Sequence, residues 1–208
     1  ESLQAVKSFI TGNPAIKIEG VLTFWEDDVL LTSKIAERFN LVGIPFNVAR
    51  RARNKFVFRE FCAEHGFPSP RHILVKNNED LEKAAAELSF PLVIKPAYGS
   101  SSAYVVKVAD AEELEKTYQY IKKNISISIE SALTDGLDIL VEEYIDGEEV
   151  DIDLLLQNGK IKFFTVADND KTNEPFFIET GRTTPSVLPE VNQRQLIQMA
   201  EDILERLG

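Results

Sequence analysis

The stretch PLVIKPAYGSSS, residues 91–102, decides how the rest of the sequence is interpreted. Its first half is apolar and β-branched, which predicts a buried strand over residues 91–95. The strand ends on Lys95 and leads directly into a loop rich in glycine and serine. A lysine at this place can reach a phosphate group, while loop N–H groups and serine hydroxyls bind its other oxygens. A strand-end lysine that only extends into solvent is the alternative.

Charges of opposite sign gather in two other segments. Residues 124–159 contain ten acidic residues and no Lys, Arg or His, and VEEYIDGEEVD, residues 141–151, lies among them. Five basic residues lie close together earlier in the chain: Arg50, Arg51, Arg53, Lys55 and Arg59. Each segment has an ordinary explanation, a solvated helix face for the bases and a protected edge strand for the acids. Together they suit a ligand with one anionic end and hydrogen-bond donors at the other, such as a nucleotide.

Several common sites are excluded by spacing and composition. The closest two glycines, Gly12 and Gly20, are eight positions apart, so neither G-x-G-x-x-G nor the Walker loop is present. With one cysteine and two histidines, there is no H-E-x-x-H and no C-x-x-C motif. Cys62 and His65 are three residues apart, but two ligands do not make a zinc site. These histidines do not give the spacing of a Ser-His-Asp triad either.

The chain has 208 residues and a formal net charge of −11, which bounds its partners. A broad nucleic-acid surface needs an excess of Lys and Arg, so we expect no nucleic-acid partner. We also expect no membrane segment, because no apolar run approaches the roughly 18 residues of a spanning helix. Cys62 cannot form an internal disulfide, so a reduced, cytoplasmic setting is expected.

Hydrophobic periodicity predicts a chain of alternating strands and helices. The segment from 47 to 65 is expected to be one helix that closes at Gly66, and Gln157 to Lys160 is expected to be a hairpin turn. A long ordered loop is expected over residues 168–189. Strands are expected at residues 20–24, 72–76, 91–95, 104–108, 138–144, 149–156 and 161–166. Further helices are expected after residue 27 or 28, from 77 to 88, after 110 and from 191 to the end.

These motifs in this order resemble the ATP-grasp superfamily, in particular its carboxylate–amine ligases. The resemblance implies an α+β fold, the ATP-grasp fold, in which the end of an N-terminal open α/β domain precedes a lid subdomain and part of a C-terminal subdomain. Residues 1–50 correspond to the end of the N-terminal domain, 51–145 to the first helix and lid, and 146–208 to the incomplete C-terminal subdomain. The chain begins with Glu1 and its last helix runs to Gly208, so we expect a piece of a longer protein.

The resemblance also implies a residue set for the phosphate end of ATP. Lys55 and Lys95 correspond to the two lysines that contact the phosphates. The loop that closes over the triphosphate corresponds to the serines that follow Gly99, namely Ser100, Ser101 and Ser102.

For the base end, the resemblance assigns Glu142 to the adenine amine and Glu149 to the ribose hydroxyls. The backbone around Glu143 and Ile145 would meet the adenine edge. In the later loop FIETGR, residues 177–182, Glu179 and Arg182 would face the substrate.

Three departures from the family pattern stand out. Tyr104 places a bulky ring where relatives have a small residue and glycine, and Arg182 stands where they commonly have histidine. The glutamate pair and asparagine that bind the metal lie further along in the family than residue 208. We therefore assign no metal ligand and no catalytic residue within this sequence.

The reaction implied by the resemblance is ATP-dependent and uses Mg²⁺. The γ-phosphoryl group moves to a carboxylate, and an amine then displaces phosphate from the acyl phosphate to form an amide, with amino acids as expected substrates. Two alternatives stay open: a non-catalytic ATP-binding or regulatory module on the same scaffold, and a ligase with a thiol or bicarbonate acceptor. A fragment without the metal ligands is expected to be inactive, and a homodimer through the N-terminal domain is a further expectation.

Overall fold

The computed structural model describes residues 1–129 and 131–208, which form two compact units, Glu1–Asn54 and Lys55–Gly208. Glu130, one of the ten acids of the predicted acidic segment, lies outside the described residues. The helices of the first unit are α1 (Ser2–Gly12), the 3-10 turn η1 (Glu26–Asp28), α2 (Val29–Phe39) and α3 (Phe46–Arg53). The domain limits expected at residues 50/51 and 145/146 stay predictions.

The strand expected at residues 20–24 does not form, and this prediction is wrong. The segment makes a single parallel bridge, between Gly20 and Val42, and is otherwise irregular. A strand needs a ladder of neighbouring backbone groups, and the described part of this unit supplies one pair only. The partner segment of the bridge packs on α2: an added Cβ at Gly43, the residue after Val42, would stand 2.6 Å from the Ala36 Cβ.

The helix expected from 47 to 65 is broken at Asn54 into α3 and α4 (Lys55–Glu64). Asn54 has an extended backbone, with φ −89° and ψ 107°. The Lys55 N–H donates to the Ala97 carbonyl at 2.8 Å, so the backbone is bonded to the loop after β2 rather than to the preceding helix. The end of α4 is as predicted: Gly66 has φ 75° and the Phe67 N–H donates to the Cys62 carbonyl.

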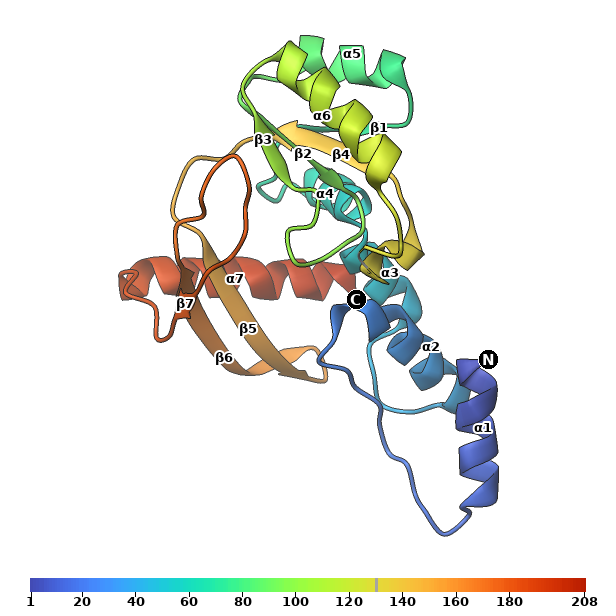
Figure 1. Ribbon diagram of the computed structural model, residues 1–208. Coiled ribbons are helices and arrows are strands. Elements are labelled where there is room, and N and C mark those ends of the chain that lie inside the picture. The colour runs from blue at the N-terminus through green and yellow to red at the C-terminus, as the bar shows by residue number, and fades with distance from the viewer. Residues whose placement is uncertain (130) are drawn as a thin grey trace. The chain divides into compact units, whose positions relative to one another are not determined.

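A four-stranded antiparallel sheet forms the centre of the second unit, in the order β1-β4-β2-β3. Its strands are β1 (His72–Val75), β2 (Leu92–Pro96), β3 (Val106–Val108) and β4 (Ile139–Glu143). The helices α5 (Asn78–Glu87) and α6 (Ala111–Asn124) lie on one side of this sheet, and α4 lies on the other (Figure 1). The side chains of Asn77 and Asp110 cap the two helices, each by accepting from the backbone N–H three residues on.

The two faces of this sheet have different chemistry because side chains alternate along each strand. Leu92, Ile94 and Val141 point toward α5 and α6 and are fully buried in the main core. Their neighbours Lys95 and Glu142 therefore point to the opposite face. Lys95 and Glu142 thus lie on the face of the sheet opposite the apolar core, and the packing of that core holds their strands in place.

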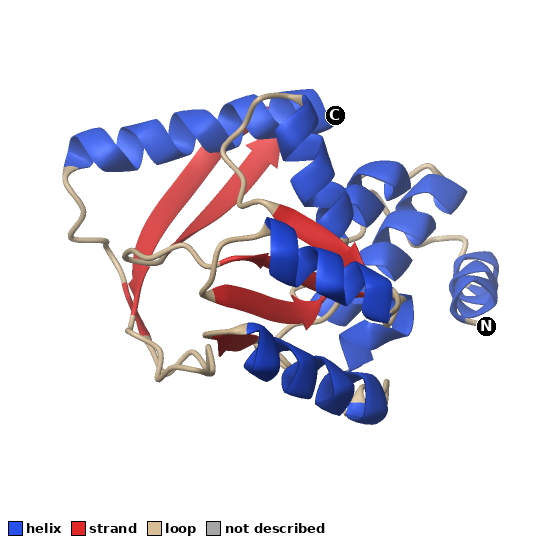
Figure 2. Ribbon diagram, turned by 90° about the horizontal axis from the view of Figure 1, so that it is seen from above, coloured by secondary structure: helices blue, strands red, loops and turns tan. Residues whose placement is uncertain are grey.

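The second sheet contains β5 (Val150–Gln157), β6 (Lys160–Asn169) and the short β7 (Arg182–Thr183) in antiparallel order. The helix α7 (Glu190–Leu207) runs along it (Figure 2). The predicted hairpin is confirmed, since Asn158 and Gly159 both have positive φ, 52° and 73°. The 3-10 helix η2 (Ser131–Asp135) lies between α6 and β4 in the sequence. Within residues 1–129 and 131–208, none of the helices has the length and apolarity to cross a membrane.

Candidate functional site

A cleft of about 940 Å³ in the second unit gathers most of the predicted site residues. One wall is the charged face of the four-stranded sheet with the serine loop, and the other comes from residues 145–150 and the long loop after β6. A volume of this size suits a small-molecule ligand. The predicted residues that line it are Lys55, Lys95, Ser100, Ser101, Ser102, Glu142, Glu143, Ile145, Glu149 and Glu179.

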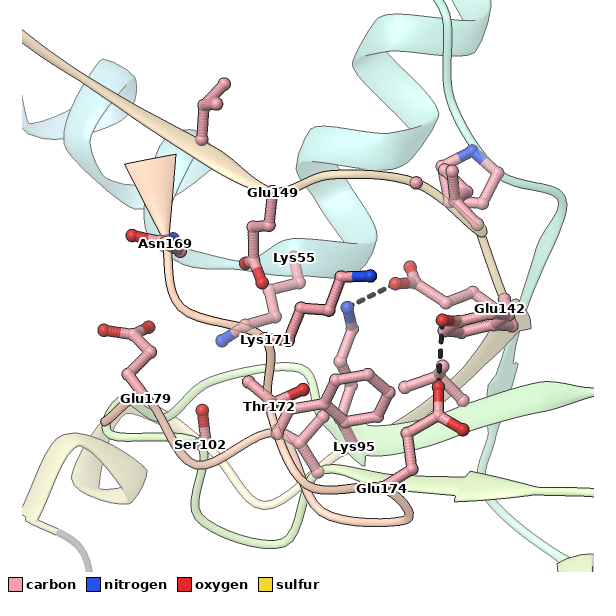
Figure 3. A pocket seen from close by; sticks show the side chains of 18 of the residues that line it. Lys55, Lys95, Ser102, Glu142, Glu149, Asn169, Lys171, Thr172, Glu174 and Glu179 are labelled. Carbon is pink, nitrogen blue, oxygen red and sulfur yellow. Dashed lines mark hydrogen bonds and ion pairs between the residues drawn. The ribbon is translucent and has the colours of Figure 1, made fainter. Parts of the chain in front are cut away.

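Glu142 is the most buried charged group of the cleft, with 6% of its surface exposed. Lys95 donates to its Oε1, and the Arg59 Nε donates to its Oε2 at 3.1 Å. Val93 lies directly opposite Glu142 in the ladder between β2 and β4, so Lys95 is its diagonal neighbour on the same face. Two cations from different elements therefore share one carboxylate (Figure 3 shows the Lys95 bond).

The charge states of this cluster follow from its surroundings. Burial tends to raise the pKa of Glu142, but the charges of Lys95 and Arg59 and their hydrogen bonds outweigh it and lower the pKa below its ordinary value. Burial lowers the pKa of Lys95, more than Glu142 raises it. Glu142 is therefore ionised at neutral pH, and its two cations are held in place for a further anionic or polar group in the cleft.

The serine loop has a backbone shaped to surround an anion. Gly99, Ser101 and Ser102 have positive φ of 118°, 53° and 54°. Successive N–H groups in a turn conformation form concave sites, called nests, that bind phosphate oxygens. Lys55 is tied to the same loop, because its Nζ donates to the Gly99 carbonyl at 2.9 Å. Cations and loop donors therefore line the same cleft.

Tyr104 points away from the cleft. Its hydroxyl donates to the Asn124 carbonyl at 2.7 Å, and its ring packs against the main core. Burial, together with Tyr120, raises the pKa of the phenol. The bulky residue that departs from the family pattern thus anchors the end of the serine loop to the C-terminal end of α6.

The cleft is also lined by a second group of carboxylates, Glu149 and Glu179. Burial, and after it the charges of Glu179 and Asp151, raise the pKa of Glu149. Asn169 lies beside Glu149 in Figure 3, and its Nδ2 is buried without a hydrogen-bond partner in the described residues. A buried donor without a partner is costly, which favours a ligand acceptor at this place.

Arg182, predicted to face the substrate, does not line the cleft. Its guanidinium contacts two aspartates of β5, with the Nη1 3.3 Å from Asp151 Oδ2 and the Nη2 3.2 Å from Asp153 Oδ2. About half of its side chain is exposed. The arginine balances acids of the second sheet, and a substrate role for it stays a prediction.

Several cleft residues were not among the predicted set. Arg59 was noted only as part of the basic segment, and Asn169, Lys171 and Thr172 only as part of the long loop. The Lys171 side chain reaches into the same cleft as Lys95 (Figure 3), and it has no hydrogen bond or ion pair in the part of the chain that the structure describes. The length of the loop was the available signal, since long ordered loops are usually functional.

No residues could be assigned to a metal ion. Among residues 1–129 and 131–208, no group of three or more His, Cys, Asp or Glu side chains is arranged to hold one. We therefore derive no step through a metal from these residues.

The structure defines an α+β fold with a cleft of ligand size, and comparison with known proteins gives the family. The family described as ATP-grasp domain matches residues 88–208, more than half of the chain. The chain therefore belongs to the ATP-grasp family, and its fold is the ATP-grasp fold.

Relatives within the family include ligases. Alanine–anticapsin ligase of Bacillus subtilis (strain 168) is 30% identical over 189 residues, which cover 85% of this chain and 40% of the relative. A crystal structure of L-amino acid ligase from Bacillus licheniformis has a TM-score of 0.79 at 28% identity and covers 99% of this chain and 45% of that one. The chain spans less than half the length of these two relatives.

A more distant likeness concerns the fold alone. The biotin carboxylase domain dimer of Hydrogenobacter thermophilus 2-oxoglutarate carboxylase, solved with MgADP, ADP and bicarbonate, has a TM-score of 0.76 at 16% identity. It covers 100% of this chain and 46% of that chain.

Proposed function

We propose that this chain is the ATP-binding part of a ligase that activates a carboxylate as an acyl phosphate and joins it to an amine. The observation that carries the proposal is one cleft lined both by phosphate-binding groups, Lys55, Lys95 and the serine loop, and by the carboxylates of Glu142 and Glu149. The ligase names of the relatives support the reaction class. Amino acids are the proposed substrates.

The chemistry of the cleft fits ATP. Phosphate oxygens accept from lysines and from backbone nests, so we assign the triphosphate to Lys55, Lys95 and the loop of Ser100–102, with Lys171 as an added cation. Adenine amine and ribose hydroxyls donate, so we assign them to Glu142 and Glu149, with the backbone at Glu143 and Ile145 on the adenine edge. Glu179 lines the same cleft and is proposed to face the substrate.

Phosphoryl transfer depends mainly on positioning and on neutralising charge. This chain's own contribution is to hold the triphosphate between fixed cations, which is why no single side chain is assigned as a general base. Mg²⁺ would supply further charge neutralisation when bound. The residues that the structure describes supply no ligand set for it, so magnesium use rests on the family likeness.

The test is an assay of ATP turnover. The intact ligase proposed to contain this chain is incubated with Mg-ATP and pairs of L-amino acids, and ADP, phosphate and the mass of the product are measured. The expected result is ADP release only with a carboxylic acid and an amine, and a product with the mass of both amino acids less one water.

Matched reactions separate the rival functions. ADP release that needs a thiol or bicarbonate instead of an amine would contradict the amine acceptor. Absence of turnover with every acceptor, together with ATP binding, would favour the non-catalytic module. Lys95→Gln is the variant of the cleft, and Lys123→Gln, on the exposed end of α6, serves as its control.

The proposal extends to setting and assembly. We propose a reduced, cytoplasmic compartment and a homodimer, the latter supported by the dimeric carboxylase domain that shares the fold. Light scattering of the purified protein measures the mass in solution, and a monomer at all concentrations would exclude the dimer.

A further inference from the structure

The loop of residues 170–181, here called the strap, leaves the second sheet and returns to it. At its base, the Asp170 N–H donates to the Gly181 carbonyl at 2.9 Å. The next pair along the ladder, Asn169 with Arg182, belongs to the pairing of β6 with β7. The two ends of the strap are therefore fixed to each other and to the three-stranded sheet.

The middle of the strap is bonded to the other sheet. Phe176 makes an antiparallel bridge with Val106, and the Lys107 N–H donates to the Pro175 carbonyl at 2.8 Å. Both partners belong to β3, which is the edge strand of the four-stranded sheet. The strap thus uses backbone groups that an edge strand leaves unpaired, and it spans from one wall of the cleft to the other.

Three side chains from distant parts of the sequence meet where the strap reaches β3. The Lys107 Nζ lies 2.8 Å from both carboxylate oxygens of Glu174, and the Tyr144 hydroxyl donates to Glu174 Oε1 at 3.0 Å (Figure 3 shows the latter bond). The Lys107 Nζ also lies 3.8 Å from the centre of the Tyr144 ring. We call Lys107, Tyr144 and Glu174 the clasp.

The clasp is charged near neutral pH and well connected. The hydrogen bond to Glu174 raises the pKa of Lys107, and hydrogen bonds from Lys107 and Tyr144 lower that of Glu174. Only 21% of the Lys107 side chain is exposed, although Glu174 is about half exposed. Tyr144 also contacts the Phe177 ring, with ring centres 6.3 Å apart.

The position of the strap matters because of the side chains it carries. Lys171, Thr172, Phe177 and Glu179 all line the cleft, and each belongs to the strap. Two clasp residues, Tyr144 and Glu174, line the cleft as well. Opening the clasp would move the strap side chains and leave the sheet wall unchanged.

We propose that Lys107, Tyr144 and Glu174 are positioning residues, which hold the strap across the cleft and through it set the affinity for the nucleotide. The second half of this inference rests on the proposed function. The first half concerns the strap alone and can be measured without any turnover.

Trypsin cleavage after Lys171 reports the position of the strap. The full chain is digested briefly, and the rate of cleavage at Lys171 is measured by mass spectrometry for wild type, Lys107→Met and Glu174→Gln. Each variant breaks the ion pair, so we expect cleavage roughly three- to tenfold faster than in wild type. The control pair is Lys116→Met and Glu112→Gln, which breaks an exposed ion pair on α6 and should leave the rate unchanged.

A charge exchange separates positioning from general loss of stability. The double variant Lys107→Glu with Glu174→Lys restores an ion pair of reversed polarity, and we expect it to recover most of the slow cleavage. Cleavage at Lys107 itself is absent from the Met and Glu variants and does not interfere with the Lys171 product. An unchanged rate in both single variants, or a double variant no slower than either, overturns the inference.

Nucleotide affinity tests the second half. The dissociation constant for ATP is measured by calorimetry for the same variants, and we expect it to rise about threefold or more in each single variant and to recover in the exchange. Faster cleavage with an unchanged dissociation constant overturns the link to affinity. Absence of ATP binding by wild type contradicts the proposed function instead, and the cleavage results then still decide whether the clasp holds the strap.

Discussion

The two sheets of the second unit form the two sides of one cleft, yet they are built in opposite ways. The four-stranded sheet is buried on its helix side, and the four residues Ile139–Glu142 of β4 are all buried. In the three-stranded sheet, large apolar residues such as Leu155 and Phe163 are about 60% exposed, and β7 has two residues. The first sheet is a rigid support, whereas the second relies on the strap and α7 for its contacts.

This difference explains how charge is handled on each side. On the four-stranded sheet, a buried carboxylate is matched by two cations from α4 and β2. On the three-stranded sheet, Arg182 meets two aspartates at the surface, where water already solvates all three. Buried charges must be paired and exposed charges need not be. We therefore expect the buried cluster to control both stability and ligand binding.

The largest contrast should come from the apolar cores. Ile94→Ala removes a side chain with no exposed surface, and we expect it to lower the free energy of unfolding by about 2–5 kcal/mol. Leu155→Ala removes a side chain that is 62% exposed and should change it by less than about 0.5 kcal/mol. Urea unfolding followed by circular dichroism measures both. Equal losses would show that the two sheets share one core.

The next contrast concerns the two ion clusters. Glu142→Gln leaves Lys95 and Arg59 without their anion and should cost roughly 3 kcal/mol. Arg182→Gln breaks two half-exposed pairs and should cost less than about 1 kcal/mol. Thermal unfolding at neutral pH provides the comparison. A loss of stability in Arg182→Gln as large as that in Glu142→Gln would contradict the view that only the buried ion cluster matters for stability.

The Glu142→Gln variant also predicts how the stability depends on pH. The pKa of Glu142 is lower in the folded protein than its ordinary value of 4.5, so its stabilising contribution is complete above pH 4.5. The contribution is lost as the pH falls through the folded-state value. The stability gap between wild type and Glu142→Gln should therefore be constant near neutrality and narrow in acid. A stability gap that widens in acid would contradict the lowered pKa of Glu142.

A smaller effect is expected behind the serine loop. An added Cβ at Gly136 would lie 2.8 Å from the Tyr98 ring, and Tyr98 lines the cleft. Gly136→Ala should therefore push the ring toward the cleft, at a cost of about 1–3 kcal/mol, and weaken ATP binding. Gly12→Ala is the matched control, since nothing lies within 4 Å of its added Cβ and Gly12 does not line the cleft. Unchanged melting and ATP affinity in Gly136→Ala would contradict the account.

The smallest effect is expected in the hairpin of the second sheet. Gly159 has φ 73°, and alanine in this left-handed region costs about 1 kcal/mol. We expect Gly159→Ala to lower the melting temperature slightly and to leave ATP affinity unchanged, because the turn is not part of the cleft lining. Loss of ATP affinity in this variant would show that the far end of the sheet is coupled to the site.

The sequence predicts most of the elements because local signals agree with the final contacts. The caps at Asn77 and Asp110, the Gly66 helix end and the Asn158-Gly159 turn each act over three or four residues. The errors occur where a distant partner decides. The break at Asn54 depends on Ala97, and the missing strand at residues 20–24 depends on neighbours that this unit does not provide.

Most residues that line the cleft could be predicted from sequence motifs, but the contacts between them could not. Motifs indicated Lys95 and Glu142 separately, but their contact depends on the register of β2 against β4, which brings together residues 47 positions apart. Arg59 joins them from α4, and its role could not be read from the basic segment alone. The contacts of Arg182 could not be predicted either, because the two aspartates that it contacts lie on β5, 29 and 31 positions earlier in the sequence.

The most direct test of the central claim is a calorimetric titration of the chain with ATP. We predict binding at one site, weakened by about tenfold or more in Lys95→Gln and unchanged in Lys123→Gln. Circular dichroism establishes that both variants are folded. No heat of binding for wild type, or equal affinities in all three proteins, would contradict the assignment of this cleft to ATP.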